Sequence, residues 1–203
     1  MLAKLLSMKK ILLIGNGARE HIIAETLKRS PQTVSIAAYG KSLNPGISKL
    51  SDAYEIGNVT DIDHIQRFAL EQKADFAVVG PEDPIAAGVV DKLLESGIPS
   101  VAPLRICAQL ESSKSFTRDL VVKYGIPGNP LFQVFTSPEG MEEFVHKVEG
   151  HFVVKADGLT AGKGVRVSGD HFSTSQEGLA YALECLSHDE RVVLEEKLIG
   201  QEF

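Results

Sequence analysis

Short apolar runs alternate with helix-like segments through the first hundred residues, and this alternation constrains the fold more than any other feature of the chain. The runs predicted to be strands are Ile11–Ile14, Val34–Ala38, Ala53–Ile56, Phe76–Val79 and Ser100–Ala102. Because these runs are mostly apolar rather than strictly alternating with polar residues, they are typical of strands buried on both sides. The pattern therefore predicts an α/β fold, with a doubly wound parallel sheet covered by helices on both faces.

Capping signals predict where several helices begin. Thr60 is the predicted N-cap of a helix that runs to about Gln72. Ile85–Glu95 is predicted as one helix, and Arg105–Tyr124 as helical with a break near Ser112. Further along the chain, Ser137 is the predicted cap of a helix with Pro138 in its first position, and a capping box at Thr174 and Glu177 is expected to open the last helix.

The segment "GIPGNP", Gly125–Pro130, forbids regular structure and suggests a domain boundary. We expect a first domain at residues 1–124 and a second at 125–203. The second begins with a predicted strand and has further strands at Phe152–Lys155, Val165–Val167 and Val192–Glu196. This arrangement indicates a small α+β unit.

Composition excludes several classes of protein. The 203 residues are 43% hydrophobic and 24% charged, as in a globular protein, and the net charge of −6 argues against nucleic acid as a partner. Cys107 and Cys185 lack metal-ligand spacing, which favours a reducing, cytoplasmic compartment. No apolar run is long enough for a membrane span. We expect Met1–Ser7 to be a disordered leader, or Met8 to be the true start.

The stretch "ILLIGNGAREH" places a glycine turn between the first strand and its helix, a position where backbone amides can bind an anion. A dinucleotide site would have a third glycine where Glu20 stands and an acid at the end of the second strand, where Tyr39 follows Ala38. The pattern thus disfavours NAD and is compatible with a smaller phosphorylated ligand. A turn that needs glycine for packing alone fits this motif equally well.

Two further segments carry groups that suit binding, although each also has a simpler structural explanation. "VVGPEDP" ends the fourth strand, where ligands bind open α/β sheets; Glu82 could bind a sugar hydroxyl, or these acids could cap a helix. "LESSKSFTRDL" puts Lys114 among serines at a helix start, where it could meet a phosphate or remain solvated.

The stretch "VVKADGLTAGKGVRV" has more glycines and lysines than a hairpin needs. Lys155 ends a strand, and the loop Gly158–Gly164 with Lys163 can fold over a polyphosphate, although it lacks the Walker pattern. Binding is therefore favoured over a plain turn. The last segment, "VVLEEKLIGQEF", by itself predicts a strand followed by solvated charges.

Taken together, "GNGAREH", "VVGPEDP", "AQLESSKSFTRDL", "VVKADGLTAGKGV" and "VVLEEKLIGQE" resemble, in order, the glycinamide ribonucleotide synthetase (phosphoribosylamine–glycine ligase) family of the ATP-grasp superfamily. The resemblance implies a Rossmann-like pre-ATP-grasp domain followed by the small ATP-grasp subdomain. It also implies ATP-dependent ligation of glycine to 5-phosphoribosylamine through a glycyl phosphate, in purine biosynthesis. The cofactors implied are ATP and Mg²⁺.

Site residues follow from the same resemblance. Lys155 and Lys163 are the expected catalytic residues. ATP is expected to bind Lys114, Lys155, Gly158, Gly162, Lys163, Gly164, Glu195, Glu196, Leu198 and Glu202, with Glu195–Leu198 reading the adenine and Glu202 the ribose. Phosphoribosylamine is expected at Gly15, Asn16, Gly17, Glu20, Asn44, Gly46, Glu82 and Asp83.

The chain departs from the family pattern at two places. Ala18 stands where many members carry a second glycine, and the loop Tyr39–Leu50 is longer and more basic than the usual "PGNAG". Lys41, Asn44 and Gly46 are expected to replace the phosphate contacts of that loop.

The family's metal ligands belong to a later region, so no residue here is predicted to bind metal and the chain alone is expected to be inactive. The alternatives are another ATP-grasp ligase or carboxylase, a noncatalytic nucleotide-binding module and, least favoured, an NAD-dependent oxidoreductase. The sequence does not determine the oligomeric state.

Overall fold

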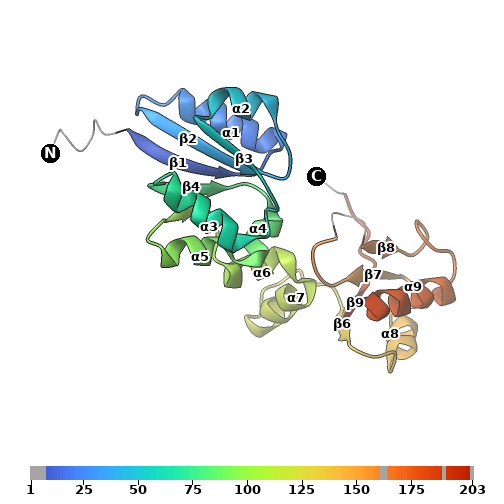
Figure 1. The fold of residues 1–203 in the computed structure, drawn as a ribbon. Helices are drawn as coiled ribbons and strands as arrows, with labels where there is room; N and C mark the ends of the chain where they lie inside the picture. The colour runs from blue at the N-terminus through green and yellow to red at the C-terminus, as the bar shows by residue number, and fades with distance from the viewer. Residues whose placement is uncertain (1–7, 161–163, 189–190, 202–203) are drawn as a thin grey trace. The chain divides into compact units, whose positions relative to one another are not determined.

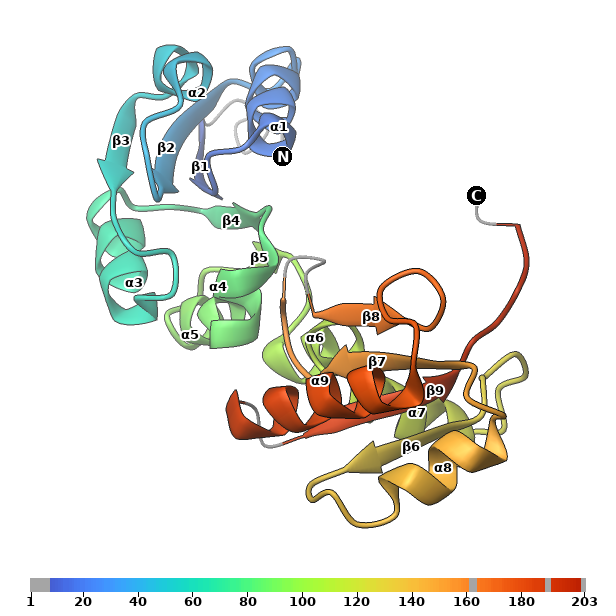
Figure 2. The same cartoon turned by 90° about the vertical axis from the view of Figure 1, so that its right-hand side faces the viewer.

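The structure, a computed structural model, describes residues 8–160, 164–188 and 191–201. It divides into two compact units, Met1–Ala108 and Gln109–Phe203, which are described separately below. Figures 1 and 2 show the elements of both units. Residues 1–7, and with them the expected leader, lie outside the described residues.

The first unit is built on a five-stranded parallel sheet with the order β3-β2-β1-β4-β5. The strands are β1 (Lys9–Ile14), β2 (Val34–Gly40), β3 (Ala53–Ile56), β4 (Phe76–Val79) and β5 (Ser100–Val101). The predicted parallel sheet is therefore confirmed. The carboxyl ends of β1, β2 and β4 lie next to one another, where the order of the strands reverses, so this edge is the expected ligand-binding edge.

Helices cover both faces of this sheet, as predicted. One face packs on α1 (Ala18–Lys28) and α2 (Pro45–Leu50), and buries Leu13, Ile36 and Ala38. The other packs on α3 (Ile62–Glu71), α4 (Glu82–Ala87) and α5 (Val89–Glu95), and buries Leu12, Ile14 and Tyr39. Because successive strand residues point to opposite faces, each apolar run supplies both cores.

Three predicted helix boundaries were wrong. Asp61, not Thr60, caps α3 and accepts a hydrogen bond from the His64 amide. The segment predicted as one helix is split into α4 and α5 at Gly88, whose φ of +98° is a left-handed conformation that ends a helix. Helix α8 (Met141–Lys147) follows Gly140 rather than Ser137.

The second unit contains a four-stranded sheet with the order β6-β9-β7-β8, paired antiparallel throughout. Its strands are β6 (Phe132–Phe135), β7 (Phe152–Ala156), β8 (Val165–Val167) and β9 (Val192–Glu196). Helix α8 and helix α9 (Ser175–His188) cover one face around a buried core. The expected capping box is present, since Thr174 and Glu177 exchange hydrogen bonds.

Helix α7 (Lys114–Lys123), which follows α6 (Arg105–Ser112), packs on the other face of this sheet. Helix α7 contacts β9 and bonds through Lys114 and Arg118 to residues of the second unit. The division of the structure therefore falls before this helix, at residue 108, whereas we expected it at residue 124. Helix α7 belongs with the second unit because it packs on β9, although the Gly-Pro segment comes after it in the chain.

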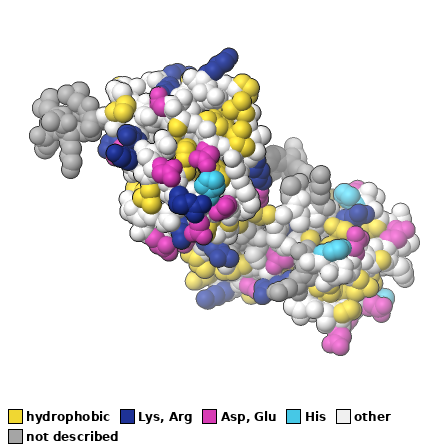
Figure 3. Space-filling model, in the orientation of Figure 1, with side chains coloured by type: hydrophobic (Ala, Val, Ile, Leu, Met, Phe, Trp, Pro, Cys, Tyr) yellow, Lys and Arg dark blue, Asp and Glu magenta, His cyan; other side chains and the backbone are white. Residues whose placement is uncertain are grey.

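No helix among the described residues is both long enough and apolar enough to cross a bilayer. On the face shown in Figure 3, acidic and basic side chains lie next to one another over the first unit. Among the exposed pairs are Lys41 with Asp83 and Lys92 with Asp63. The two signs of charge are therefore mixed on this face.

Candidate functional site: a pocket and a sheet edge

A pocket of about 360 Å³ lies on the face of the second sheet that α8 and α9 leave uncovered. Its lining residues come from α7, β7, β8, β9 and nearby loops: Arg118, Pro130, Val153, Lys155, Val165, Val167, Asp170, Glu195, Glu196, Lys197 and Leu198. Three valines give it apolar walls, and six charged side chains line it as well. A pocket with apolar walls and a few polar groups is typical of small-molecule sites.

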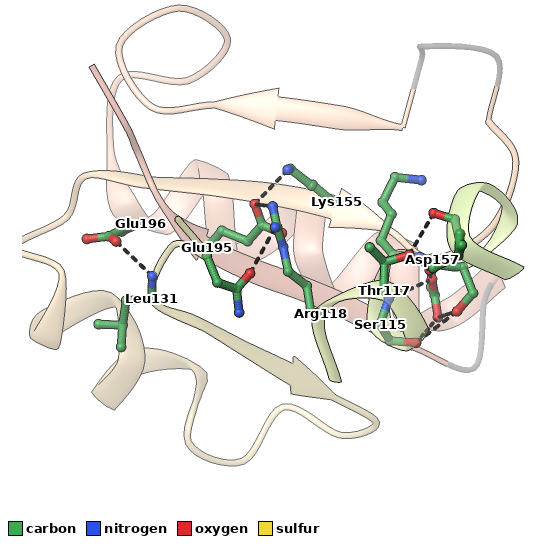
Figure 4. Close-up of polar contacts among 12 residues, drawn as sticks. Ser115, Thr117, Arg118, Leu131, Lys155, Asp157, Glu195 and Glu196 are labelled. Carbon is green, nitrogen blue, oxygen red and sulfur yellow. Dashed lines mark hydrogen bonds and ion pairs between the residues drawn. The ribbon is translucent and has the colours of Figure 1, made fainter. Parts of the chain in front are cut away.

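The acid Glu195 is the most buried charged group of this pocket and binds two cations. Arg118 donates to its carboxylate through Nε at 2.6 Å and Nη2 at 2.9 Å, and Lys155 Nζ lies 2.6 Å from Oε2. Figure 4 shows both cations pointing at Glu195. Arg118 also donates to Asn129. The three charged groups sum to one positive charge, which suits an anionic ligand.

Strand register explains how Lys155 reaches Glu195. On the paired strands β7 and β9, Val153 lies opposite Glu195, so Lys155 is the diagonal neighbour on the same face. Alternation puts Phe152 and Val154 in the core beneath the helices and leaves Lys155 on the pocket face.

The charge state of Glu195 follows from these partners. Burial raises the pKa of its carboxyl, but the hydrogen bonds and charges of Arg118 and Lys155 outweigh burial and hold the pKa below its usual value. Glu195 is therefore ionised at neutral pH, with only 3% of its surface exposed. Both carboxylate oxygens are bound by these cations, so the geometry favours a structural ion pair over a direct contact of this acid with the adenine expected from the resemblance.

The segment after β9 can present backbone groups to a base. The Glu196 carboxylate accepts the Leu131 amide at 2.7 Å, and Lys197 Nζ binds Asp170 and the Ser168 carbonyl. Leu198 is largely exposed at the pocket rim. Because both side chains are held elsewhere, the groups that this segment offers to the adenine expected from the resemblance are its backbone and Leu198.

A second polar cluster joins the start of α7 to the end of β7. The Asp157 carboxylate accepts hydrogen bonds from the amides of Lys114 and Ser115 and from the hydroxyls of Ser113 and Ser115. Lys114 Nζ donates to the Gly158 carbonyl at 2.7 Å. Asp157 thus binds the backbone amides of Lys114 and Ser115 at the start of α7. The predicted phosphate contact at this helix start is therefore the ammonium of Lys114, not these amides.

Gly158, at the start of the glycine loop, has a φ of +103°, which a side chain would oppose. At the other end, the Gly164 amide donates to Thr160. Three predicted ATP-binding residues, Gly162, Lys163 and Glu202, lie outside the described residues.

In the first unit, Glu20 of α1 lies buried at the carboxyl edge of the sheet. Its Oε2 accepts the Gly17 amide at 2.6 Å, and its side chain packs against Gly15 and Gly80, where an added methyl group would clash with it. Glu20 therefore uses part of the helix N-terminus that a dinucleotide pyrophosphate would need. This packing supports the prediction that NAD does not bind here.

The loop after β2 is tied to the glycine turn by amide side chains. Asn16 accepts the Lys41 amide and donates to Ser42, while Asn44 Nδ2 donates to the Asn16 carbonyl. Asn44 also caps α2 by accepting the amides of Gly46 and Ile47. Asn16, Asn44 and Gly46 thus lie together at this edge, as predicted for residues of one site.

Glu82 and Asp83 reach the same edge from α4, and each pairs with a cation. Arg19 Nη1 lies 3.2 Å from Glu82 Oε1 and also donates to the Gly80 carbonyl, and Lys41 Nζ lies 2.8 Å from Asp83 Oδ2. Acids and cations that alternate on one exposed edge suit a ligand with both hydroxyl and phosphate groups.

Comparison with known protein families decides the ancestry of these two units. The model described as the phosphoribosylglycinamide synthetase N domain matches residues 9–111, and that described as the ATP-grasp (A) domain of the same enzyme matches residues 112–203. The chain belongs to the phosphoribosylglycinamide synthetase family. The predicted resemblance is confirmed, and the two matched regions meet close to the division seen in the structure.

Curated members of the phosphoribosylglycinamide synthetase family include proteins named phosphoribosylamine–glycine ligase. The one from Methanopyrus kandleri is 43% identical over 201 residues, covering 97% of this chain and 45% of the relative. The one from Pyrococcus furiosus is 39% identical, covering 97% of this chain and 44% of the relative. The chain thus spans about 45% of the length of these relatives.

Solved structures share the fold of this phosphoribosylglycinamide synthetase family member. A phosphoribosylamine–glycine ligase from Thermotoga maritima has a TM-score of 0.70 at 24% identity and covers 95% of this chain and 44% of its own. An N5-carboxyaminoimidazole synthetase from Staphylococcus aureus, complexed with ADP, has a TM-score of 0.74 at 17% identity. The match covers 94% of this chain and 48% of the synthetase chain. These likenesses confirm the predicted fold of an ATP-grasp ligase.

Sequence reasoning missed Arg118, Asn129, Asp157 and Arg19 in this phosphoribosylglycinamide synthetase family member. Arg118 is one helical turn beyond Lys114, so periodicity could have placed both on one face of α7. Nothing local in the sequence pairs Asp157 with Ser115, which lies 42 residues earlier.

Proposed function

We propose that this chain provides the substrate-binding unit and the first part of the nucleotide site of a phosphoribosylamine–glycine ligase. The reaction is the ATP-dependent joining of glycine to 5-phosphoribosylamine, giving glycinamide ribonucleotide, ADP and phosphate in purine biosynthesis. The observation that carries the proposal is the match of both family models in tandem along residues 9–203, together with the names of the curated relatives.

The chemistry requires activation of a carboxylate, which is a poor electrophile. Glycine's carboxylate oxygen attacks the γ-phosphorus of ATP, the bond to ADP breaks, and a glycyl phosphate forms. The amine of phosphoribosylamine then attacks the acyl carbon, phosphate leaves, and the amine gives up a proton as the amide forms. Negative charge accumulates on the phosphoryl oxygens, so we assign Lys114, Lys155 and Lys163 to hold it.

The geometry of the pocket supports this assignment for Lys155. Its ammonium lies on a rigid strand beside the cation Arg118, and one of the two positive charges is left uncompensated by Glu195. The apolar pocket walls suit the adenine ring, and the backbone of Glu196–Leu198 lies at the rim. We assign the carboxyl edge of the first sheet, with Asn16, Asn44, Gly46, Glu82 and Asp83, to phosphoribosylamine.

We also propose that the reaction needs Mg²⁺ held by residues outside this chain. Among the described residues there is no group of three or more His, Cys, Asp or Glu that could hold a metal ion. The three acids that line the pocket are already engaged: Glu195 by Arg118 and Lys155, Asp170 by Lys197, and Glu196 by the Leu131 amide. We place the protein in the reducing cytoplasm, in keeping with Cys107 and Cys185, which are both free thiols.

Product analysis tests the proposal. A protein in which residues 1–203 are followed by the remaining part of the Methanopyrus kandleri relative should release ADP only when glycine and phosphoribosylamine are both present. Equal turnover with bicarbonate or another carboxylic acid would favour a different ATP-grasp enzyme. In parallel, calorimetric titration of the 203-residue chain with MgATP and with NADH should show binding of ATP alone; if neither nucleotide binds, the assignment of the pocket is wrong.

A further inference from the structure

Asp157 lies directly after β7, and its carboxylate reaches the first turn of α7. We propose that Asp157 is a positioning residue that holds Lys114 and the start of the glycine loop in one rigid arrangement for the nucleotide phosphates. This inference rests on the proposed function, because it concerns how that nucleotide site is organised.

The carboxylate is bound on the helix side by backbone and hydroxyl groups. Lys114 N lies 2.7 Å from Oδ1 and Ser115 N 3.3 Å from it, while Ser115 Oγ lies 2.5 Å and Ser113 Oγ 3.2 Å from Oδ2. Figure 4 shows these contacts converging on Asp157. Ser115 is fully buried. The backbone of Lys114 is therefore fixed directly by the acid.

Asp157, Gly158 and Lys114 form a closed ring of hydrogen bonds at the start of the glycine loop. Oδ1 of Asp157 also accepts the Gly158 amide at 3.2 Å, and the Gly158 carbonyl accepts the ammonium of Lys114 at 2.7 Å. The same lysine is thus bound to Asp157 through its amide and to the next residue through its side chain. A shift of Asp157 moves both ends of Lys114 and the first residue of the loop together.

Helix capping alone does not account for Asp157. Ser113 already caps α7 by accepting the Phe116 amide at 3.2 Å, as a local cap does. Asp157 comes from 43 residues further along the chain than Lys114 and adds a tie between the helix and the strand. Its charge also compensates the positive end of the helix dipole, so an incoming phosphate meets the Lys114 ammonium instead of the helix amides.

The experiment compares Asp157→Asn with Asp119→Asn, the same chemical change on an exposed residue of α7. MgATP affinity of the 203-residue chain should fall about tenfold for Asp157→Asn, the usual size of a lost charged hydrogen bond, and stay unchanged for Asp119→Asn. In a Lys114→Met background, Asp157→Asn should cause no further loss, because its effect passes through Lys114. An equal loss in both backgrounds would overturn the inference.

Two further measurements keep the test decisive. Ser115→Ala keeps the charge and removes one hydrogen bond; it should weaken MgATP binding about threefold even where Asp157→Asn fails to fold. Without nucleotide, Asp157→Asn should speed hydrogen exchange at the amides of Lys114 and Gly158. If the unsubstituted chain binds no MgATP, the proposed function fails and this inference with it. If the chain binds and both variants match Asp119→Asn, only the inference fails.

Discussion

The ammonium of Lys155 lies 2.6 Å from the carboxylate of Glu195, and this ion pair bridges two strands that are far apart in the sequence. Arg118 donates to both oxygens of the same carboxylate. The lysine assigned to the phosphates is therefore held in place before any nucleotide arrives. A preorganised cation loses little conformational freedom when it binds a phosphate.

Glu195→Gln should destabilise the chain by about 3 kcal/mol, because it leaves Arg118 and Lys155 as like charges without their anion in a poorly solvated site. Urea unfolding at neutral pH measures the free energy of unfolding. Glu143→Gln on the exposed face of α8 is the matched control and should change little. Equal stability of the two variants would show that the ion pair contributes nothing to folding.

Stability should decrease at acid pH because Glu195 and Asp157 have lowered pKa values. For Asp157, burial raises the pKa, but hydrogen bonds from Ser115, Lys114 and Ser113 outweigh it. The stabilisation from each group is present above its unfolded pKa, near 4, and is lost as the pH falls through the lower folded pKa. Below about pH 4 the unfolded chain binds more protons than the folded one, so stability drops.

Urea unfolding across this pH range checks the prediction. The acid-induced loss should be smaller in Glu195→Gln and in Asp157→Asn than in the unsubstituted chain, because each variant lacks one of the two groups. If the stability of a variant depends on pH as that of the unsubstituted chain does, the acid replaced in that variant does not contribute to the loss of stability at low pH.

Lys155→Ala should weaken MgATP binding by about 2–3 kcal/mol, since a desolvated charged contact to phosphate is lost. Isothermal titration with MgATP gives the dissociation constant. Lys147→Ala, on an exposed residue of α8, makes the same chemical change away from the pocket and should bind as before. Unchanged affinity in Lys155→Ala would exclude this lysine from the nucleotide site.

Gly158→Ala should destabilise the start of the glycine loop by about 1–2 kcal/mol, the cost of a side chain at a left-handed backbone. A methyl group there meets no atom within 4 Å, so the cost comes from the backbone alone. Gly200→Ala is the control, because Gly200 has open space and no positive φ. Gly158→Ala should have a lower unfolding temperature and a weaker affinity for MgATP than Gly200→Ala. If Gly158→Ala equals the unsubstituted chain in both measurements, the left-handed conformation is not required.

Formation of glycinamide ribonucleotide should be absent when the 203 residues are assayed alone with ATP, glycine and phosphoribosylamine. The reason is that the chain spans about 45% of the length of its curated relatives and its described residues hold no metal-binding group of acids. Chromatographic detection of the product measures this. Turnover above a Lys155→Ala control would contradict it.

Helix starts were the least predictable part of the fold. Thr60 looks like a cap by residue type, yet Asp61 takes that place because the chain turns one residue later. The sequence pattern predicted one helix that continues through Gly88, but this residue adopts a φ of +98° and separates α4 from α5. Both outcomes depend on how the helices pack on the sheet, which residue type alone does not encode.

The candidate sites show the same limit. The strand pattern predicted that Lys155 ends a strand, and the family resemblance predicted that Asn16, Asn44, Glu82 and Asp83 belong to one site. It could not predict that the Glu195 carboxylate faces cations instead of a base. That outcome required the register of β7 on β9 and the docking of α7, which bring Arg118 to the same carboxylate.

The sequence by itself determined the parallel sheet, its helices on both faces, and the family, because apolar periodicity and ordered motifs are local properties of the chain. The tertiary structure decided the partners of the charged groups: Glu195 with Lys155 and Arg118, and Asp157 with the start of α7. Ion pairs and hydrogen bonds between residues 40 or more positions apart depend on strand order and helix docking, and those are set by burial of the whole core.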